Sequence, residues 1–292
     1  MLQYFKAVFY RFLRFVLRLM NKVALLVVNR FSNGSRLKSD SQKTNYEASV
    51  VKIISNDIRF NNFRRNFSYS EIVENVTYFQ GIAYINRIKQ LDLGNFDYKA
   101  KHQNDSIGNP ILFKFPEFGK ISPTTLRYIS VALEIKNRFG SDLTGDFVEI
   151  GGGYGGQISI LADYFRINSY GVYDLCDVQI LIKKYLDSIN KIKNVEFLNL
   201  ETSKPKDWDL VISNYAFSEL PRKLQEIYID KVLLKSQRGY LIMNSGRENL
   251  TNRSVGKLNL KELQDLLPSF EVLEEMPKTG PDNYVIIWGH KS

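Results

Sequence analysis

One segment constrains the fold of this chain more than any other, because an apolar run, a glycine-rich turn and a helical pattern follow one another without a break. The apolar run is Phe147–Ile150, the turn spans residues 151–156, and the helical pattern covers Gln157–Phe165. Glycine lets the backbone turn tightly and come close to a bound molecule. A helix that starts after such a turn aims its amide groups at the same place. We call residues 151–156 the glycine turn and expect it to hold a ligand.

After residue 145 the chain alternates short β-branched runs with amphipathic segments, which is typical of βαβ units around a parallel sheet. We expect strands at Phe147–Ile150, Ser169–Asp174, Val195–Leu198, Leu210–Ser213, Tyr240–Met243, Phe270–Leu273 and Tyr284–Trp288. We expect helices at Gln157–Phe165, Val178–Ser188, Arg222–Lys235 and Leu260–Leu267. The last two strands are joined by a loop too short for a crossover helix, so they should form an antiparallel hairpin at the sheet edge. The sequence therefore predicts a doubly wound α/β fold, whose ligands bind at the carboxyl ends of the strands.

The segment before this sheet has a helical pattern. Ser68 and Glu71 have the spacing of a capping box, an apolar stripe continues to Ile85, and a second helix is expected over Pro123–Phe139. Residues 31–46 are polar and indicate a linker. We therefore expect three parts: an N-terminal helix and linker over residues 1–40, a helical cap over 41–140, and a Rossmann-like domain over 141–292.

The N-terminal segment concentrates the positive charge of the chain. Residues 1–40 hold eight Lys or Arg residues and one acid, so the net charge of +9 leaves only +2 for the other 252 residues. On a helix the basic side chains form one narrow face, and the rest of the surface is apolar. We expect residues 5–30 to lie in the plane of an anionic membrane. Docking on the protein's own body or on a partner, or a targeting role, is the alternative.

Composition excludes some other classes of protein. The hydrophobic fraction of 44% is that of an ordinary globular protein, and no apolar run is long enough to span a bilayer. The single cysteine, Cys176, excludes an intrachain disulfide and a cysteine-based zinc cluster. No His-rich or acidic spacing indicates a metal site. Because the body of the chain is nearly neutral, nucleic acid is not an expected partner.

Two acids near the glycine turn point to the kind of ligand. Asp174 ends the second expected strand about 20 residues after the turn, where a carboxylate can accept hydrogen bonds from the hydroxyls of a ribose; capping of the next helix is its alternative role. NAD(P) and S-adenosylmethionine both fit these features. Glu149 favours the second, because an acid attracts the cationic groups of S-adenosylmethionine and repels a pyrophosphate.

The stretch Asp146–Gly156 resembles motif I of class I S-adenosylmethionine-dependent methyltransferases, and in particular of sugar O-methyltransferases from bacterial glycan gene clusters. Residues 121–128, 173–175 and 213–220 also resemble that family. The resemblance covers about residues 65–290. It implies a seven-stranded Rossmann-like sheet with an antiparallel last strand, and S-adenosylmethionine as the cofactor. The expected cofactor-binding residues are Glu149, Gly151, Gly152, Gly153, Gly155, Asp174, Leu175 and Asn214.

The same stretches contain the candidates for the acceptor side. Glu219 is the candidate general base, with a dipole or capping role for the next helix as its alternative. Arg127, Tyr128 and Tyr215 are candidate acceptor-binding residues, and an arginine at this place can clamp a carboxylate or phosphate; a structural role for Arg127 is the alternative.

Together these features predict a cytoplasmic O-methyltransferase, peripheral on the inner membrane face, that methylates a sugar hydroxyl of a surface glycan or of its lipid-linked precursor. An NAD(P)-dependent oxidoreductase is one alternative. A non-catalytic, membrane-associated interaction module that keeps the cofactor fold is another. The acceptor sugar and the oligomeric state do not follow from the sequence.

Overall fold

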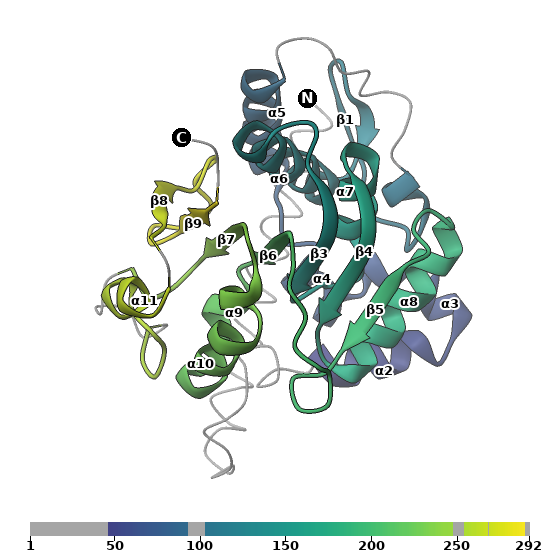
Figure 1. The fold of residues 1–292 in the computed structure, drawn as a ribbon. Helices are drawn as coiled ribbons and strands as arrows, with labels where there is room; N and C mark the ends of the chain where they lie inside the picture. The colour runs from purple at the N-terminus through teal and green to yellow at the C-terminus, as the bar shows by residue number, and fades with distance from the viewer. Residues whose placement is uncertain (1–45, 93–102, 248–253, 268, 290–292) are drawn as a thin grey trace.

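The computed structural model describes residues 46–92, 103–247, 254–267 and 269–289, so the basic helix expected within residues 1–40 lies outside the described part. A seven-stranded sheet forms the centre of the molecule, with helices on both faces (Figure 1). Its strands are β3 (Thr144–Ile150), β4 (Arg166–Tyr173), β5 (Val195–Leu198), β6 (Leu210–Asn214), β7 (Gly239–Met243), β8 (Glu271–Glu274) and β9 (Tyr284–Trp288). A separate hairpin pairs β1 (Phe113–Phe115) with β2 (Gly119–Ile121).

The strand order in the sheet is β5-β4-β3-β6-β7-β9-β8. Neighbouring strands from β5 to β7 are parallel, and β9 is antiparallel to both β7 and β8. This arrangement confirms the seven-stranded fold with an antiparallel last strand and the terminal hairpin. The chain runs outward from β3 in both directions, so the gap between the carboxyl ends of β3 and β6 is the topological switch point, where ligands of doubly wound sheets bind.

The helices that follow the sheet strands are α7 (Gly156–Tyr164), α8 (Cys176–Ile189), α9 (Ala216–Glu219), α10 (Arg222–Lys231) and α11 (Leu260–Leu266). Alternation along the strands divides the core: Phe147 packs with the layer of α7 and α8, and Val148 packs with the layer of α10 and α11 (Figure 1). This period of two is expected for a strand buried on both faces. It also places Glu149 on the same side as Phe147.

A set of helices before the sheet covers one end of it. They are α2 (Tyr46–Ile54), α3 (Asp57–Phe60), α4 (Phe67–Val73), α5 (Tyr78–Leu91) and α6 (Pro123–Phe139), with short 3-10 helices at η2 (Phe63–Arg65) and η3 (Gln103–Ser106). A further 3-10 helix, η4 (Leu233–Lys235), lies in the sheet domain directly after α10. The helix α6 has the bounds that the sequence predicts, and the serine at position 122 caps it. It packs against both α5 and α7, and so joins the helical segment to the sheet.

Two helix boundaries differ from the prediction. The capping box expected at Ser68 is wrong, because the N-cap residue of α4 is Asn66. Its side chain accepts a hydrogen bond from the Tyr69 amide. A capping box does occur, but it lies at Thr77 and Gln80, where α5 starts. The apolar stripe is therefore split between two helices, because the chain leaves the helical conformation after α4. The long helix expected from Arg222 also breaks, at Val232, into α10 and η4.

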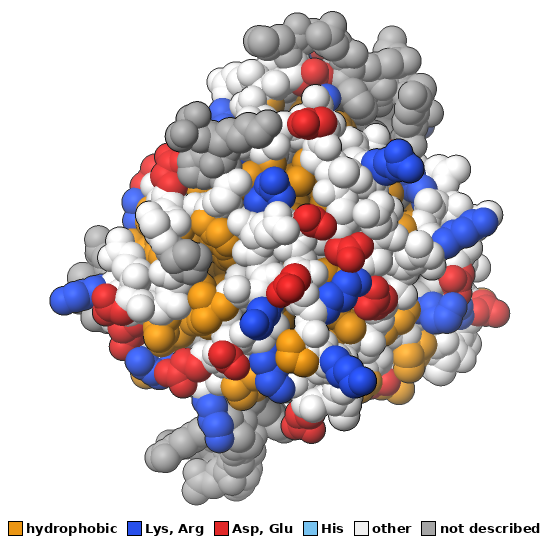
Figure 2. All heavy atoms as spheres, viewed as in Figure 1, with side chains coloured by type: hydrophobic (Ala, Val, Ile, Leu, Met, Phe, Trp, Pro, Cys, Tyr) orange, Lys and Arg blue, Asp and Glu red, His pale blue; other side chains and the backbone are white. Residues whose placement is uncertain are grey.

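The surface of the described residues shows no concentration of one charge on the face drawn in Figure 2. Lys and Arg side chains are interspersed there with Asp and Glu, and apolar patches lie between them. This face is therefore unlike the continuous basic surface of a polyanion-binding protein. Among the described helices, none is both long and apolar enough to cross a bilayer.

Candidate functional site

A cavity of about 430 Å³ lies at the carboxyl ends of β3, β4, β6 and β7. The sheet contributes residues from the ends of these strands, and the helical segment contributes the opposite wall. The lining residues are Tyr46, Ile72, Val73, Asn75, Val76, Thr77, Gln80, Tyr84, Arg127, Tyr128, Glu149, Gly151, Gly152, Gly153, Gln157, Asp174, Asn214, Tyr215, Ala216, Glu219, Asn244, Thr279, Gly280 and Asn283. The structure thus brings together all but two of the candidate site residues, at the switch point of the sheet. The two exceptions are Gly155 and Leu175.

Two glycines of the glycine turn, Gly153 and Gly155, have different roles. Gly153 has a φ of +62°, and a Cβ added there would meet only Val73, at 3.6 Å, beside the cavity. Gly155 has a φ of +91° and caps α7, but a Cβ there would lie 3.2–3.3 Å from the side chains of Ile182, Leu186 and Tyr185. Gly153 therefore leaves space for a ligand, whereas Gly155 allows the turn to pack on α8.

Asp174 forms part of the cavity wall directly after β4. One carboxylate oxygen accepts from the Leu175 amide at 2.8 Å, and the other accepts from the Gly153 amide at 3.3 Å. Each oxygen can accept a second hydrogen bond, so Asp174 can still bind two hydroxyl groups. It does not cap α8, whose N-cap residue is Leu175. The Leu175 side chain packs against the core and does not line the cavity.

Glu149 is almost fully buried, with 1% of its surface exposed, and it accepts a hydrogen bond from the Tyr170 hydroxyl at 3.0 Å. Burial, opposed by the hydrogen bond from Tyr170 and supported by the nearby charge of Asp174, raises the pKa of Glu149 to about 8. Burial also raises the pKa of Asp174 to about 6. Two acids with raised pKa values in one wall favour a cationic ligand, because a positive charge restores the stability of the carboxylate form.

Asn214 adds an open acceptor to the same wall. Its side-chain amide nitrogen donates to the Gln157 oxygen at 3.3 Å, and Gln157 in turn donates to the backbone oxygen of Tyr128 at 3.2 Å. The Asn214 Oδ1 atom is buried and has no hydrogen-bond partner. Because a buried unpaired carbonyl is costly, this atom fits a ligand that brings a donor such as an ammonium group.

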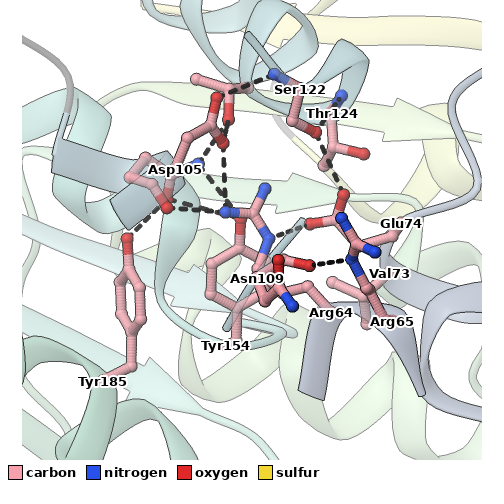
Figure 3. A network of polar contacts seen from close by, with 12 residues as sticks. Arg64, Arg65, Val73, Glu74, Asp105, Asn109, Ser122, Thr124, Tyr154 and Tyr185 are labelled. Carbon is pink, nitrogen blue, oxygen red and sulfur yellow. Dashed lines mark hydrogen bonds and ion pairs between the residues drawn. The ribbon is translucent and has the colours of Figure 1, made fainter. Parts of the chain in front are cut away.

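A buried polar network holds the glycine turn against the helical segment (Figure 3). The guanidinium of Arg64 pairs with Glu74 and, at 3.1 Å, with Asp105, and it stacks 5.0 Å from the ring centre of Tyr154 in the turn. Further contacts within the network are made by the side chains of Asn104, Ser122, Thr125 and Tyr185. Glu74 and Asp105 therefore have a structural role as the ion-pair partners of Arg64, and the Arg64 guanidinium holds the Tyr154 ring in place.

The acceptor half of the cavity contains a buried arginine among tyrosines. Arg127 donates to Asn75 Oδ1 at 3.2 Å and to the Val73 carbonyl oxygen at 3.4 Å. Its guanidinium carbon lies 5.4 Å from the ring centre of Tyr128 and 5.9 Å from that of Tyr215. These contacts place three candidate acceptor residues side by side.

Tyr215 has a strained backbone at the end of β6. Its φ of +71° is in the left-handed region, which is rare for a bulky residue. Such strain persists only where the surroundings enforce it, and it is commonest at functional sites. Here the side chain points to a buried carboxylate, because the Tyr215 hydroxyl donates a short hydrogen bond to Glu275. The Glu275 carboxylate also accepts from Thr279 and Asn283.

Glu219 is the last residue of α9 and lines the cavity. Its Oε1 atom accepts from the side-chain amide of Asn244 at 2.8 Å. The N-cap of α10 is Pro221, so Glu219 does not cap that helix. The geometry leaves the carboxylate at the cavity with one oxygen held in place. In the described part of the chain, no three His, Cys, Asp or Glu side chains are close enough to hold a metal ion.

Several lining residues were not singled out from the sequence. They are chiefly Tyr46, Asn75, Thr77, Gln80, Tyr84, Gln157, Asn244, Thr279 and Asn283. Asn244 and the segment 275–283 follow the strands β7 and β8, so the rule that ligands bind after strand ends would have found them. Tyr46 is the first residue of α2 and reaches the cavity from more than 100 positions before the glycine turn, and no local pattern signals this.

No protein-family model and no curated protein matches the chain. Some solved structures are similar to this chain over about half of its length. A mitomycin 7-O-methyltransferase is 13% identical, with a TM-score of 0.44 over 57% of this chain and 53% of the other. A SAM-dependent methyltransferase from Aquifex aeolicus is 13% identical, with a TM-score of 0.39 over 53% and 87%. The [4+2]-cyclase SpnF is 15% identical, with a TM-score of 0.41 over 50% and 58%. This chain thus spans about half the length of the mitomycin enzyme, and at these identities the similarity assigns no reaction.

Proposed function

We propose that this chain is an S-adenosylmethionine-dependent O-methyltransferase that acts on a sugar hydroxyl. One observation supports the cofactor above all: Glu149, Asp174 and the unpartnered Asn214 Oδ1 atom, all acceptors, meet beside the glycine turn. S-adenosylmethionine offers matching groups, namely an ammonium, a sulfonium and two ribose hydroxyls. We assign Glu149 and Asn214 to its amino acid part, Asp174 to its ribose, and Gly151, Gly152 and Gly153 to the backbone that lies against it.

The same wall argues against a nicotinamide dinucleotide. A pyrophosphate at the glycine turn would bring negative charge next to the Asp174 carboxylate, and it would oppose ionisation of Glu149. Among the described lining residues, Arg127 is the one basic side chain that could compensate this charge. Like charges repel strongly in a partly buried site. The charge of the wall therefore favours the cationic cofactor over NAD(P).

Methyl transfer needs alignment and, for a hydroxyl acceptor, removal of a proton. When bound, S-adenosylmethionine would supply an activated methyl group for transfer to the acceptor oxygen, with S-adenosylhomocysteine as the leaving group. Glu219 is the proposed base that takes the hydroxyl proton, because its carboxylate lines the cavity and Asn244 fixes one oxygen. Tyr215 is the proposed positioning residue beside it.

Replacement of the base tests this assignment. We expect E219Q to lower the rate of methyl transfer by about 10²-fold or more, the usual contribution of general base catalysis, with unchanged affinity for S-adenosylhomocysteine. The matched control is E201Q, since Glu201 is exposed and outside the cavity. Methyl transfer is measured with labelled donor and a panel of sugars, sugar phosphates and sugar nucleotides. A full rate in E219Q would remove Glu219 as the base, and no turnover with any acceptor would favour the non-catalytic module.

Two features support a sugar as the acceptor. The sequence stretches around Arg127 and Glu219 resemble those of sugar O-methyltransferases, and the acceptor half of the cavity combines tyrosine rings with side-chain amides. The rings are those of Tyr84, Tyr128 and Tyr215, and the amides are those of Asn75, Gln80, Asn244 and Asn283. Aromatic faces pack on the apolar faces of sugar rings, and amides both donate to and accept from hydroxyl groups.

The basic N-terminal segment supports a location at a membrane. We propose that residues 5–30 bind an anionic bilayer in its plane, on the cytoplasmic side, and keep the enzyme near a lipid-linked glycan acceptor. Flotation with liposomes that contain anionic lipid tests this. The full chain should float and a chain without residues 1–38 should not; equal flotation of both would disprove the membrane role and favour docking on protein.

A further inference from the structure

Arg127 is a buried cation at the cavity, and within the part of the chain that the structure describes it has no carboxylate partner. Only 9% of its surface is exposed, and no described Asp or Glu lies within ion-pair distance of it. Its hydrogen-bond partners among the described residues are neutral, namely the side chains of Asn75 and Tyr128 and the carbonyl oxygen of Val73, and its Nε atom has no partner. Arginine stays protonated when buried. The protein therefore carries a desolvated positive charge that only neutral groups and tyrosine rings stabilise.

Two other buried or half-buried arginines in the helical segment show the usual arrangement. Arg64 pairs with Glu74 and Asp105, and Arg87 pairs with Glu134, to which its Nε atom donates at 2.6 Å. A buried ion without a counter-charge destabilises a fold by several kcal/mol. Among the described residues, Arg64 and Arg87 have acidic partners and Arg127 has none, so the counter-charge of Arg127 is expected to come from a ligand.

The surroundings of Arg127 suit an anion at this end of the cavity. The segment of Asn75 and Thr77 lies at the start of the 14-residue helix α5, whose N-terminal dipole is positive, and both residues line the cavity. The acids that line the cavity are Glu149, Asp174 and Glu219, and in the described part of the chain no ion pair joins any of them to Arg127. Glu275 lies behind Tyr215, where Tyr215, Thr279 and Asn283 occupy its carboxylate.

We propose that Arg127 is the binding site for an anionic group of the acceptor, a carboxylate or a phosphate ester. The planar guanidinium matches either group, and both form charge-assisted hydrogen bonds with it. This inference rests on the proposed function, because it narrows the acceptor to an acidic sugar, such as a sugar acid, a sugar phosphate or a sugar nucleotide. The anionic group binds beside Tyr128 and Tyr215. The hydroxyl to be methylated lies towards Glu219, which lines the same cavity.

Simple anions test the site without knowledge of the sugar. The full chain is saturated with S-adenosylhomocysteine, and its thermal unfolding is followed as inorganic phosphate or acetate replaces chloride at constant ionic strength. An anion that binds the folded state raises the unfolding temperature. We expect phosphate, acetate or both to raise the unfolding temperature of the wild type and of the control variant R138Q. Arg138 is on the same helix as Arg127, is half-buried, and pairs weakly with Glu271 at 3.9 Å. The larger of the two shifts shows whether the site prefers phosphate or carboxylate.

The variants R127Q and R127K decide between a ligand site and a structural role. R127Q should bind either anion at least about tenfold more weakly, the loss expected for charge-assisted hydrogen bonds, while its affinity for S-adenosylhomocysteine stays unchanged. It should also unfold at no lower temperature than the wild type, because it removes an unpaired buried charge. If R127Q does not fold, R127K replaces it in the test. Lysine keeps the charge but lacks the planar guanidinium, so R127K should bind the anions more weakly than the wild type.

Two results would overturn the anion site: equal anion shifts in wild type and R127Q, or no shift of the wild type with either anion. Failure of the wild type to bind S-adenosylhomocysteine would instead overturn the proposed function, and the anion titration on the unliganded protein would still test Arg127.

Discussion

Glu149 joins the stability of the protein to its affinity for the cofactor. Burial raises its pKa to about 8 and that of Asp174 to about 6, so the folded protein holds protons that the unfolded chain has already released. Since the folded state binds more protons in this range, the stability of the unliganded protein should fall as the pH rises from about 4 to about 8. A cationic ligand reverses this effect, because it stabilises both carboxylates.

S-adenosylhomocysteine keeps the ammonium group of the donor but not its sulfonium. Through this ammonium group we expect its affinity to rise with pH, as Asp174 titrates near pH 6 and Glu149 near pH 8. The E149Q variant should lose the upper step and bind about tenfold more weakly at high pH, a change of about 1.4 kcal/mol. Calorimetry across this pH range, in buffers with different ionisation enthalpies, measures both affinity and proton release. Identical pH profiles for the wild type and E149Q would show that Glu149 does not contact the ligand.

Gly153 and Gly155, two of the glycines of the turn, allow a matched comparison. In G153A the new methyl group would enter the space beside Val73, so we expect a loss of affinity for S-adenosylhomocysteine with a modest loss of stability from the positive φ, of about 1 kcal/mol. In G155A the methyl group would press on Ile182, Leu186 and Tyr185, so stability should fall further. Denaturant unfolding and cofactor titration of both variants check this. The reverse order of effects would place the ligand elsewhere.

At the scale of elements, the network around Arg64 fixes the helical segment to the glycine turn. In R64Q the carboxylates of Glu74 and Asp105 would lose their common cation while still mostly buried. Removal of one partner from a buried ion pair typically costs about 3–5 kcal/mol. We expect R64Q to be destabilised by that amount in urea unfolding and to bind S-adenosylhomocysteine more weakly, because Tyr154 loses its stacked guanidinium. A stability change below about 1 kcal/mol would show that the network does not hold the two parts together.

The sheet elements follow from local sequence patterns, and the helical segment does not. The strands Val195–Leu198 and Tyr284–Trp288 have the bounds expected from sequence. Tyr284–Trp288 is a short apolar run buried along its whole length, whereas Val195–Leu198 is a partly buried edge strand that includes Glu196. Ser68 and Thr77 both have the spacing of a capping box, but the N-cap of α4 is Asn66, and of the two only Thr77 forms a box, at the start of α5. Local pattern also does not reveal that Glu275 binds Tyr215, since these residues belong to loops joined only through the sheet.

At the scale of the whole molecule, the sheet brings distant parts of the sequence to one switch point. Residues at the carboxyl ends of β3, β4 and β6 form the wall that contains Glu149, Asp174 and Asn214, and the helices before the sheet close the cavity with Arg127 and the tyrosines around it. The charge of the cavity is therefore divided, with acids on the expected cofactor side and a cation on the expected acceptor side. This division predicts that the cationic cofactor and an anionic acceptor bind side by side.

The central claim is that the wall beside the glycine turn binds S-adenosylmethionine and not a dinucleotide. Isothermal titration calorimetry of the full chain with S-adenosylhomocysteine, and separately with NAD and NADP, tests it most directly. The charge and the open acceptors of the wall predict saturable heat with S-adenosylhomocysteine and none with either dinucleotide. Heat with NAD or NADP alone would contradict the claim.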